Sequence, residues 1–217
     1  MTKTAVILGC GYTGKALACQ LRAQGYEVRG STRNRANARA LEALGIAPVL
    51  LDTARPETLA GFADGAALVF DMIPPRNTRG AQGEEFYEDD THALIRACAG
   101  AQIEKFVYLG STAVYGNSDG AEIDEETPVS PASPRARARV EAEEALSHAH
   151  RRDGFPAVIV RAPGIYGPGR SLAHRIRRGG YRVPGDGCNY VNRIHVHDLA
   201  QVLLAAALRG QTIDSRY

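Results

Sequence analysis

The amino-acid sequence predicts an α/β fold with a doubly wound parallel sheet, and two observations carry that prediction. Short apolar runs alternate with helical segments along most of the 217 residues, which is the pattern of parallel strands joined by helices. The first apolar run, residues 4–8, leads into the sequence GCGYTG at residues 9–14 and then into an apolar-periodic helix. A strand, a Gly-rich turn and a helix in this order form the opening unit of a Rossmann-type fold.

The Gly-rich turn matches the pattern G-x-G-x-x-G, and each glycine has a physical reason. The first allows a tight turn, the second lets the backbone approach a pyrophosphate, and the third lets the helix pack closely on the strand. The helix that begins here presents free N–H groups and a partial positive charge. The turn therefore predicts dinucleotide binding by Gly9, Gly11, Tyr12, Thr13 and Gly14.

The end of the second predicted strand, residues 26–32, bears on which dinucleotide binds. An Asp or Glu there would accept hydrogen bonds from the ribose hydroxyls of NAD. The sequence instead has Ser31, Thr32 and Arg33, with Arg35 close behind. Hydroxyl and guanidinium groups would bind a 2′-phosphate, so the sequence predicts that NADP is preferred over NAD. The alternative is that the two arginines are solvated loop charges.

The third and fourth strands, predicted at 47–51 and 67–71, end in residues that would face a ligand. Asp52 follows the third strand, where it would accept a hydrogen bond from an adenine amino group or cap the next helix. Ile73 and Pro74 follow the fourth strand and are expected at the edge of the cofactor. Further along we expect a mobile polar loop at 76–83, a helix at 84–101, a strand at 105–110, a helix at 134–150 and a strand at 157–161.

Composition limits the function classes. The formal net charge is only +2, which gives no electrostatic reason to expect a nucleic-acid or membrane partner. No apolar run approaches the roughly 20 residues that span a bilayer, and strand residues already begin at Thr4, so we expect no signal peptide. The four cysteines lack C-x-x-C spacing, which favours free thiols in a reducing cytoplasm.

Three later blocks of sequence resemble one family. They read STAVYG at residues 111–116, RAPGIYGPG at 161–169 and IHVHDLA at 194–200. Together they resemble the extended short-chain dehydrogenase/reductase superfamily, in its NAD(P)-dependent epimerase/dehydratase group. The resemblance implies an NAD(P)-binding Rossmann domain over 1–165, a partial substrate lobe over 166–197 and a return to the Rossmann domain over 198–217.

The same resemblance assigns roles to single residues. It places Ser111 among the catalytic residues and Pro163 beside the nicotinamide. In the family another strand begins about where this sequence stops, so the small C-terminal substrate lobe is either truncated in the protein or only partly included here. A small-molecule substrate is implied, and a homodimer stays open.

The departure from the family lies at residues 131–139, which read PASPRARAR. The family has Pro-x-Ser-Pro-Tyr, then three residues, then Lys; here Arg135 holds the Tyr position and Arg139 the Lys position. In the family the Tyr moves the hydroxyl proton, while the Lys lowers its pKa and holds the ribose. An arginine, with a pKa above ~12, cannot exchange a proton near neutral pH, although Arg139 could still donate to ribose hydroxyls. Only Ser111 of the usual trio is present, and its hydroxyl would polarise a carbonyl.

Two interpretations of these arginines remain open. On a helix at 134–150, Arg139 would pair with Glu143 at i,i+4 and belong to an ordinary charged face. Alternatively, Arg135 and Arg139 line the cleft and bind anionic groups.

Two functions follow. The first is an atypical NADP-dependent oxidoreductase or epimerase-like enzyme that uses Ser111 and a substitute acid/base, for which Tyr115 and Tyr166 are candidates. The second is a non-catalytic NADP(H)-binding sensor or regulatory protein. The missing Tyr and Lys favour the second function, and the intact Ser111 motif favours the first.

The segment at 167–187 is rich in Gly and Arg, including Arg170. It is either a solvated face or a site for an anionic ligand such as a sugar nucleotide. His195 and His197 alternate at a strand end, so we expect them to face opposite ways, and no third ligand is spaced for a metal. Asp198 is expected to cap the helix that follows.

Overall fold

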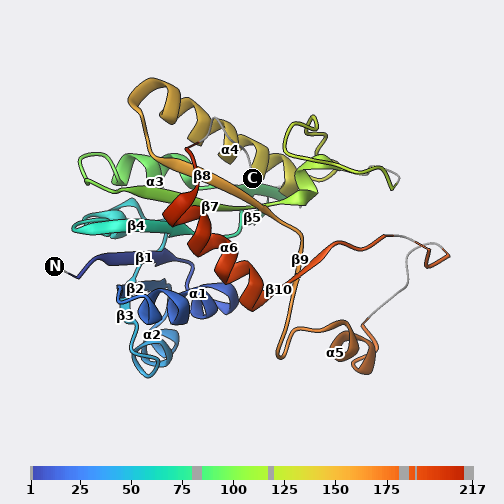
Figure 1. The fold of residues 1–217 in the computed structure, drawn as a ribbon, viewed down its shortest axis with the longest axis horizontal. Coiled ribbons are helices and arrows are strands. Elements are labelled where there is room, and N and C mark those ends of the chain that lie inside the picture. Colours follow the sequence, from blue (N-terminus) through green and yellow to red (C-terminus); the bar gives the residue numbers. More distant parts are fainter. Residues whose placement is uncertain (1, 80–84, 117–119, 181–185, 189, 213–217) are drawn as a thin grey trace.

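A six-stranded parallel sheet forms the centre of the computed structural model, which describes residues 2–79, 85–116, 120–180, 186–188 and 190–212. The strand order is β3-β2-β1-β4-β7-β8, and every neighbouring pair is parallel (Figure 1). The order reverses between β1 and β4, as in a doubly wound sheet, which confirms the predicted fold class. The strands are β1 (Thr4–Leu8), β2 (Glu27–Thr32), β3 (Ala47–Leu50), β4 (Ala66–Asp71), β7 (Lys105–Ser111) and β8 (Ala157–Ala162).

Helices cover both faces of the sheet (Figure 1). On one face lie α1 (Tyr12–Ala23), α2 (Arg35–Glu42) and α6 (Val196–Arg209); on the other lie α3 (Thr91–Ala97) and α4 (Pro134–Asp153). Successive side chains of β1 divide between the two layers: Ala5 and Ile7 join the core beneath α1 and α6, while Val6 and Leu8 join the core beneath α3 and α4. Burial on both faces explains why this strand reads as an unbroken apolar run.

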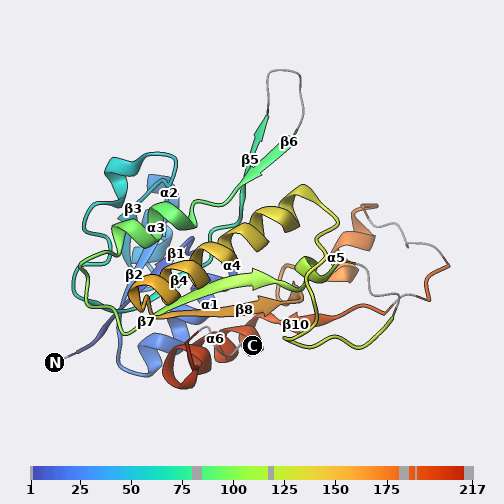
Figure 2. The same cartoon turned by 90° about the horizontal axis from the view of Figure 1, so that it is seen from above.

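The segment after β4 differs from the prediction. β5 (Arg76–Arg79) and β6 (Glu85–Glu88) pair antiparallel as a hairpin that projects from the body (Figure 2). The predicted loop at 76–83 is therefore wrong at its first four residues, and its remainder falls at 80–84, outside the described part of the chain. The predicted helix at 84–101 is wrong in its first half and begins only at Thr91, whose N–H donates to Asp89 Oδ1 at 3.1 Å.

The C-terminal part adds a two-stranded parallel sheet, β9 (Gly164–Tyr166) with β10 (Arg193–His195), and a short helix, α5 (Leu172–Arg177). Two predictions fail here. His197 lies in the first turn of α6, so its ring meets that of His195, with centroids 5.1 Å apart, instead of facing away. The cap of α6 is His195, whose Nδ1 accepts from the His197 N–H, and Asp198 lies in the first turn.

A buried ion pair joins α4 to β8. Arg161 donates from Nη2 to Glu143 Oε2 at 2.6 Å and from Nε to both carboxylate oxygens; each side chain is 6% exposed. Arg161 Nη1 also donates to the Tyr115 hydroxyl at 2.7 Å. The expected pairing of Arg139 with Glu143 is thus wrong, because Glu143 turns inward to Arg161 while Arg139 donates to the Leu109 carbonyl at 2.9 Å.

Replacing Glu143 with Ala should destabilise the protein strongly, because the Arg161 charge would stay buried without its counter-ion. Removing one partner of a buried pair typically costs about 3–5 kcal/mol of unfolding free energy, measurable by urea denaturation at neutral pH. Asp153→Ala on the same helix is the matched control, since the Arg152–Asp153 pair is exposed, and should change stability far less. Equal effects of the two changes would contradict this account.

No helix in the described part of the chain is both long and apolar enough to cross a bilayer.

Candidate functional site

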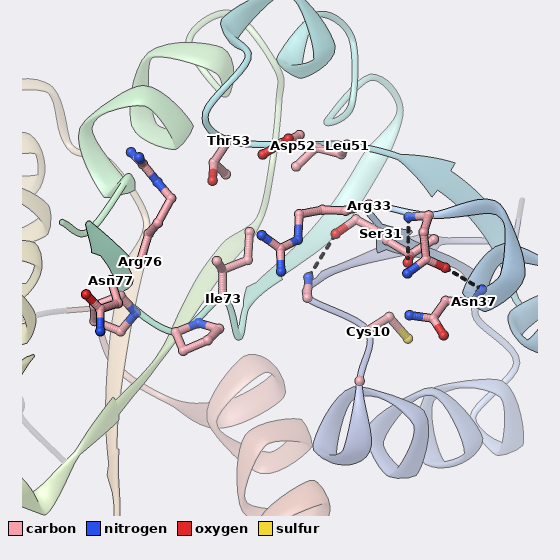
Figure 3. A pocket seen from close by; sticks show the side chains of 16 residues that line it. Cys10, Ser31, Arg33, Asn37, Leu51, Asp52, Thr53, Ile73, Arg76 and Asn77 are labelled. Atoms are coloured by element: carbon pink, nitrogen blue, oxygen red, sulfur yellow. Dashed lines mark hydrogen bonds between the residues drawn. The ribbon is translucent and has the colours of Figure 1, made fainter. Parts of the chain in front are cut away.

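A cavity of about 530 Å³ opens at the carboxyl ends of β1, β2, β3 and β4 (Figure 3). Its walls come from residues 9–11, 31–34, 51–53 and 73–77, with Asn37 of α2. These segments surround the point where the strand order reverses, which is where ligands bind in open α/β sheets.

The turn between β1 and α1 forms one end of the cavity. Gly9 adopts a positive φ of 71°, which favours glycine, and the Gly11 N–H donates back to the Gly9 carbonyl at 2.6 Å. The turn is tied to β2, because the Gly9 N–H donates to Ser31 Oγ at 2.8 Å and the Cys10 N–H to the Ser31 carbonyl at 3.1 Å. Ser31 is buried, so its hydroxyl positions the turn as well as lining the cavity.

The other two glycines have different surroundings. A Cβ at Gly14 would stand 3.1 Å from Ile7 Cγ2, so this glycine serves helix–strand packing. A Cβ at Gly11 would find only the Gly9 carbonyl oxygen, at 3.8 Å. Gly11 caps α1 without a side-chain hydrogen bond, so the helix N-terminus faces a space that a side chain would fill. This arrangement fits a pyrophosphate group of a dinucleotide.

Arg33 reaches into the cavity at its other end (Figure 3). It is exposed, and none of the ion pairs among the described residues includes it. Beside it Asn34 caps α2 by accepting from the Asn37 N–H at 2.8 Å, and both asparagines line the cavity. Arg35 begins α2 and is not part of the cavity wall. Arg33 and the N-terminus of α2 are therefore the two electropositive features at this end of the cavity.

Asp52 does not cap the next helix, which begins at Pro56 after Arg55, and its hydrogen bond to an adenine amino group stays a prediction. It lines the cavity, and its Oδ1 accepts from the Ala54 N–H at 3.2 Å, which caps the turn after β3. Its Oδ2 pairs with Arg55 at 3.4 Å. Both carboxylate oxygens therefore stabilise the loop that brings the residue to the cavity.

The buried carboxyl group of Asp71 holds the segment after β4 that lines the cavity. Ile73 and Pro74 line the cavity, and the Ile73 N–H donates to Asp71 Oδ1 at 3.0 Å. Asp71 is only 2% exposed. Burial raises its pKa to about 8, and the nearby Asp89 carboxylate adds to the rise. Asp89 accepts from the Tyr108 hydroxyl at 2.9 Å, and burial raises its pKa too.

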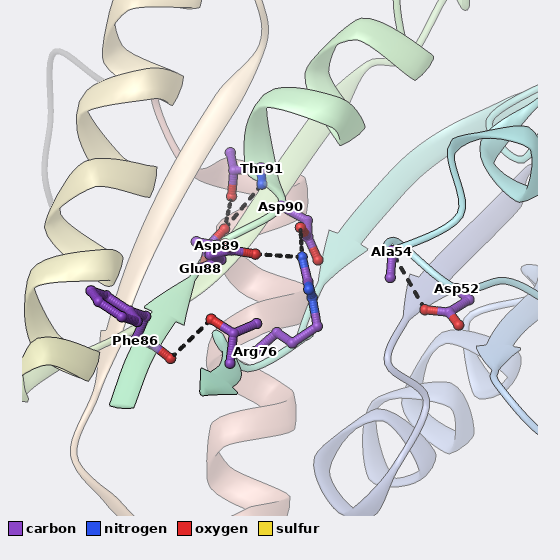
Figure 4. Close-up of polar contacts among 9 residues, drawn as sticks. Asp52, Ala54, Arg76, Phe86, Glu88, Asp89, Asp90 and Thr91 are labelled. Atoms are coloured by element: carbon purple, nitrogen blue, oxygen red, sulfur yellow. Dashed lines mark hydrogen bonds and ion pairs between the residues drawn. The ribbon is translucent and has the colours of Figure 1, made fainter. Parts of the chain in front are cut away.

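Arg76 is a wall residue that sequence reasoning missed. It pairs with Glu88 at 2.7 Å and Asp90 at 3.1 Å, which ties the hairpin base to the start of α3 (Figure 4). Asn77 and Pro75 also line the cavity. The only signal for Arg76 and Asn77 in the sequence was their position just after Pro75, because their partners Glu88, Asp90 and Tyr87 lie ten or more residues away.

The predicted catalytic residues lie outside the walls of this cavity. Ser111 ends β7, and its Oγ accepts from the Ala113 N–H at 3.2 Å. On α4, Arg135 is exposed, whereas Arg139 is half-buried. Tyr115 is buried against Arg161 and Tyr166 is 40% exposed, so only the second phenol is open to a ligand.

The remaining predicted cofactor residues are not among those that line the cavity. They are Tyr12, Thr13 and Gly14 at the start of α1, Arg139 on α4, and Pro163, which follows β8. No cluster of three or more metal-ligating side chains occurs in the described ranges.

Comparison with known proteins identifies the family. The model of the NAD dependent epimerase/dehydratase family matches residues 5–216. The chain belongs to this family. The family binds NAD(P), which agrees with the geometry of the Gly-rich turn.

Individual relatives span most of the chain. Protein YeeZ of Escherichia coli K12 is 32% identical over 216 residues, covering 96% of this chain and 75% of YeeZ. A ketoreductase of Stigmatella aurantiaca, which acts on 4-hydroxy-2-methyl-3-oxo-4-farnesyl-3,4-dihydroquinoline-1-oxide by its name, is 29% identical, covering 96% of this chain and 65% of that protein. A functionally unknown conserved protein of Silicibacter pomeroyi has a solved structure with TM-score 0.78 and 33% identity, covering 98% of this chain and 70% of that one.

A mouse dTDP-D-glucose 4,6-dehydratase is 30% identical over a shorter stretch of 131 residues, 56% of this chain and 36% of that enzyme.

Asp71 should make stability fall as pH rises. In the unfolded chain the carboxyl ionises near 3.8, whereas in the folded protein it keeps its proton until about pH 8. Between those values the folded state binds one more proton, so the unfolding free energy drops by up to about 1.4 kcal/mol per pH unit. Asp71→Asn keeps Oδ1 for the Ile73 N–H and should flatten this slope in urea denaturation between about pH 5.5 and 7.5. Parallel slopes for the two proteins would contradict the raised pKa.

Proposed function

We propose that the chain binds NADP(H) in this cavity and acts as an atypical oxidoreductase or epimerase-like enzyme of its family. The observation that carries the proposal is a cavity at the reversal of strand order with an open helix N-terminus at one end and Arg33 at the other. When bound, the nicotinamide would supply hydride donation and acceptance.

Different residues would bind different parts of the cofactor. The N–H groups of Tyr12 and Thr13 would bind the pyrophosphate at the start of α1, and Gly11, which has no side chain, would leave room for it. Arg33, helped by the N-terminus of α2, would bind the 2′-phosphate. Asp52 would accept from the adenine amino group, with Ile73 and Pro74 supplying an apolar wall.

The roles proposed for the residues near the nicotinamide follow from the resemblance to the family. Arg139 and Pro163 would face the nicotinamide ribose and ring, and the Ser111 hydroxyl would donate to a substrate carbonyl. Arg135 cannot replace a phenol, since its guanidinium stays charged near neutral pH. Among the described tyrosines, Tyr115 is held by Arg161, so it cannot take that role without breaking a buried contact.

A second candidate is a non-catalytic NADP(H) sensor. One observation favours it: Arg135 is exposed on α4, and Arg139 already donates to a backbone carbonyl, so neither forms a proton-transfer pair.

The substrate class and the compartment are further parts of the proposal. The similarity to a dTDP-D-glucose 4,6-dehydratase and the arginines of 167–187 support an anionic substrate such as a sugar nucleotide. The four cysteines are free thiols, which supports a cytoplasmic location.

NADPH should bind at least roughly tenfold more tightly than NADH, because a charge-assisted hydrogen bond contributes about 1.5–3 kcal/mol. Arg33→Glu should reverse the preference by repelling the 2′-phosphate. Arg35→Glu is the matched control: it makes the same charge change two residues away, outside the cavity wall, and should keep the preference for NADPH. Calorimetry with both cofactors measures the ratios. Equal affinities in the unmodified protein would refute the proposed selectivity.

The rate of NADPH oxidation should not depend on a titrating group with the pKa of a phenol. Single-turnover oxidation of bound NADPH, followed by its fluorescence over a panel of carbonyl compounds and sugar nucleotides, should give a rate that does not rise with pH through a phenol pKa. Ser111→Ala should lower that rate by ~10²–10³-fold, as the loss of an oxyanion donor does.

Tight NADPH binding without turnover on any member of the panel would favour the sensor instead. Turnover unaffected by Ser111→Ala would show that the carbonyl is polarised by another group.

The double change Arg135→Tyr with Arg139→Lys restores the Tyr and Lys of the family and so tests the effect of their absence directly. It should leave folding intact, since α4 already presents both positions at the family spacing.

A further inference from the structure

An acidic side chain ends β4 inside the apolar layer beneath α3 and α4. Asp71 is paired in the sheet with Leu8 of β1 on one side and with Tyr108 of β7 on the other. Paired residues of neighbouring strands point to the same face of a sheet, and both neighbours belong to the core on that face. The Asp71 carboxyl group therefore enters this core between them, where water cannot stabilise its charge.

A second carboxyl group is bound to the hydroxyl of the neighbouring tyrosine. Asp89, just before α3, accepts from the Tyr108 hydroxyl at 2.9 Å and from the Thr91 N–H at 3.1 Å. Burial raises the pKa of Tyr108, so its hydroxyl keeps its proton as the donor to Asp89. The donors around Asp89 favour its charged form, and that charge in turn favours the neutral form of Asp71.

The remaining titratable groups around Asp71 leave it without a counter-ion in the described part of the chain. Arg139 of α4 lowers the pKa of Asp71, but it donates to the Leu109 carbonyl and forms no ion pair with either aspartate there. Asp90 adds a second like charge. Cys98, which follows α3, stays a neutral thiol, since burial raises its pKa to about 12. These surroundings favour a proton on Asp71 near neutral pH.

Asp71 is linked to the Gly-rich turn through one peptide group. Its Oδ1 accepts from the Ile73 N–H at 3.0 Å. That nitrogen lies against the turn, because a Cβ at Gly9 would stand 3.1 Å from it and 3.1 Å from the Met72 carbonyl oxygen. Gly9 and Ile73 both line the cavity. A change in the charge of Asp71 thus occurs one peptide group away from the turn proposed to hold the pyrophosphate.

We propose that Asp71 and Asp89 are a proton-binding pair that couples the binding of NADP(H) to the uptake of a proton. The inference rests on the proposed function, and Asp71 acts in it as a positioning residue through Ile73. The phosphates of the cofactor add negative charge near Asp71, which favours its neutral form. The bound protein therefore keeps this proton to a higher pH than the free protein does. By linkage, the affinity for the cofactor falls as the pH rises through the pKa of Asp71 in the free protein.

Calorimetry with NADPH between about pH 7 and 9 tests the inference, because this range brackets the pKa of Asp71, about 8. The affinity of the unmodified protein should fall several-fold, and at most tenfold per pH unit for one proton. Titrations near pH 8 in Tris and in Hepes, which differ in their heat of protonation, count the protons taken up. The 2′-phosphate, a monoester that ionises near pH 6, is already charged here. Cys10 of the cavity wall stays neutral, since burial raises its pKa to about 11.

Three variants separate the pair from the other acids. Asp71→Asn should remove both the fall in affinity and the proton uptake. Asp64→Asn is the matched control: it removes an exposed carboxylate just before β4, outside the cavity wall, and should keep both. Asp89→Asn removes the like charge that raises the pKa of Asp71, so the fall in affinity should begin at lower pH. Thermal unfolding checks that each variant is folded.

The inference is overturned if NADPH binds the unmodified protein with no proton uptake, or if Asp71→Asn keeps the pH dependence of the unmodified protein. A fall in affinity that begins at the same pH in Asp89→Asn would overturn the pair, since the second carboxylate would then have no effect on the first. An unmodified protein that binds no NADPH even at pH 7 would refute the proposed function, and the inference with it.

Discussion

The hydrogen bond from the Gly9 N–H to Ser31 Oγ is the constraint on which the site depends. It joins the turn after β1 to the end of β2, so the start of α1 is held at a fixed place above the sheet. The positive φ of Gly9 makes the turn tight enough for that bond to form. Ser31 is committed to the turn, and among the wall residues just after it, 32–34, Arg33 alone carries a charge.

Charged side chains on α4 make structural contacts with the neighbouring strands. Glu143 neutralises Arg161 inside the protein, and Arg139 donates to the Leu109 carbonyl of β7. Both contacts tie α4 to the sheet, one to Arg161 near the carboxyl end of β8 and the other to β7, the strand that ends at Ser111. A lysine at position 139 has a compact point charge and would not reproduce the same planar contact. Arg139 therefore links α4 to β7 through its guanidinium group.

The sequence predicted the central fold because its strands are buried on both faces and its Gly-rich turn is a local pattern. It missed the hairpin at 76–88, since short surface strands have no buried face to impose a periodicity. Arg76 and Asn37 were missed for another reason: nothing local shows that they reach the cavity. The partner of Glu143 was assigned wrongly because an i,i+4 neighbour on the same helix is visible in sequence, whereas Arg161 comes from a strand 18 residues away.

The two ends of the site are built by different kinds of structure. The cofactor end is made by strand termini and helix starts of the central sheet, whose positions are fixed by a continuous core. The other end is made by β9, β10 and the turn at 167–170, which pack on the core beneath α1 and α6 through Ile165 and Ile194 and on Tyr12 of α1 through Gly167. The contact between Tyr12 and Gly167 joins the two parts, because the Gly167 backbone packs so closely on the Tyr12 hydroxyl that a Cβ would stand only 2.6 Å from its oxygen.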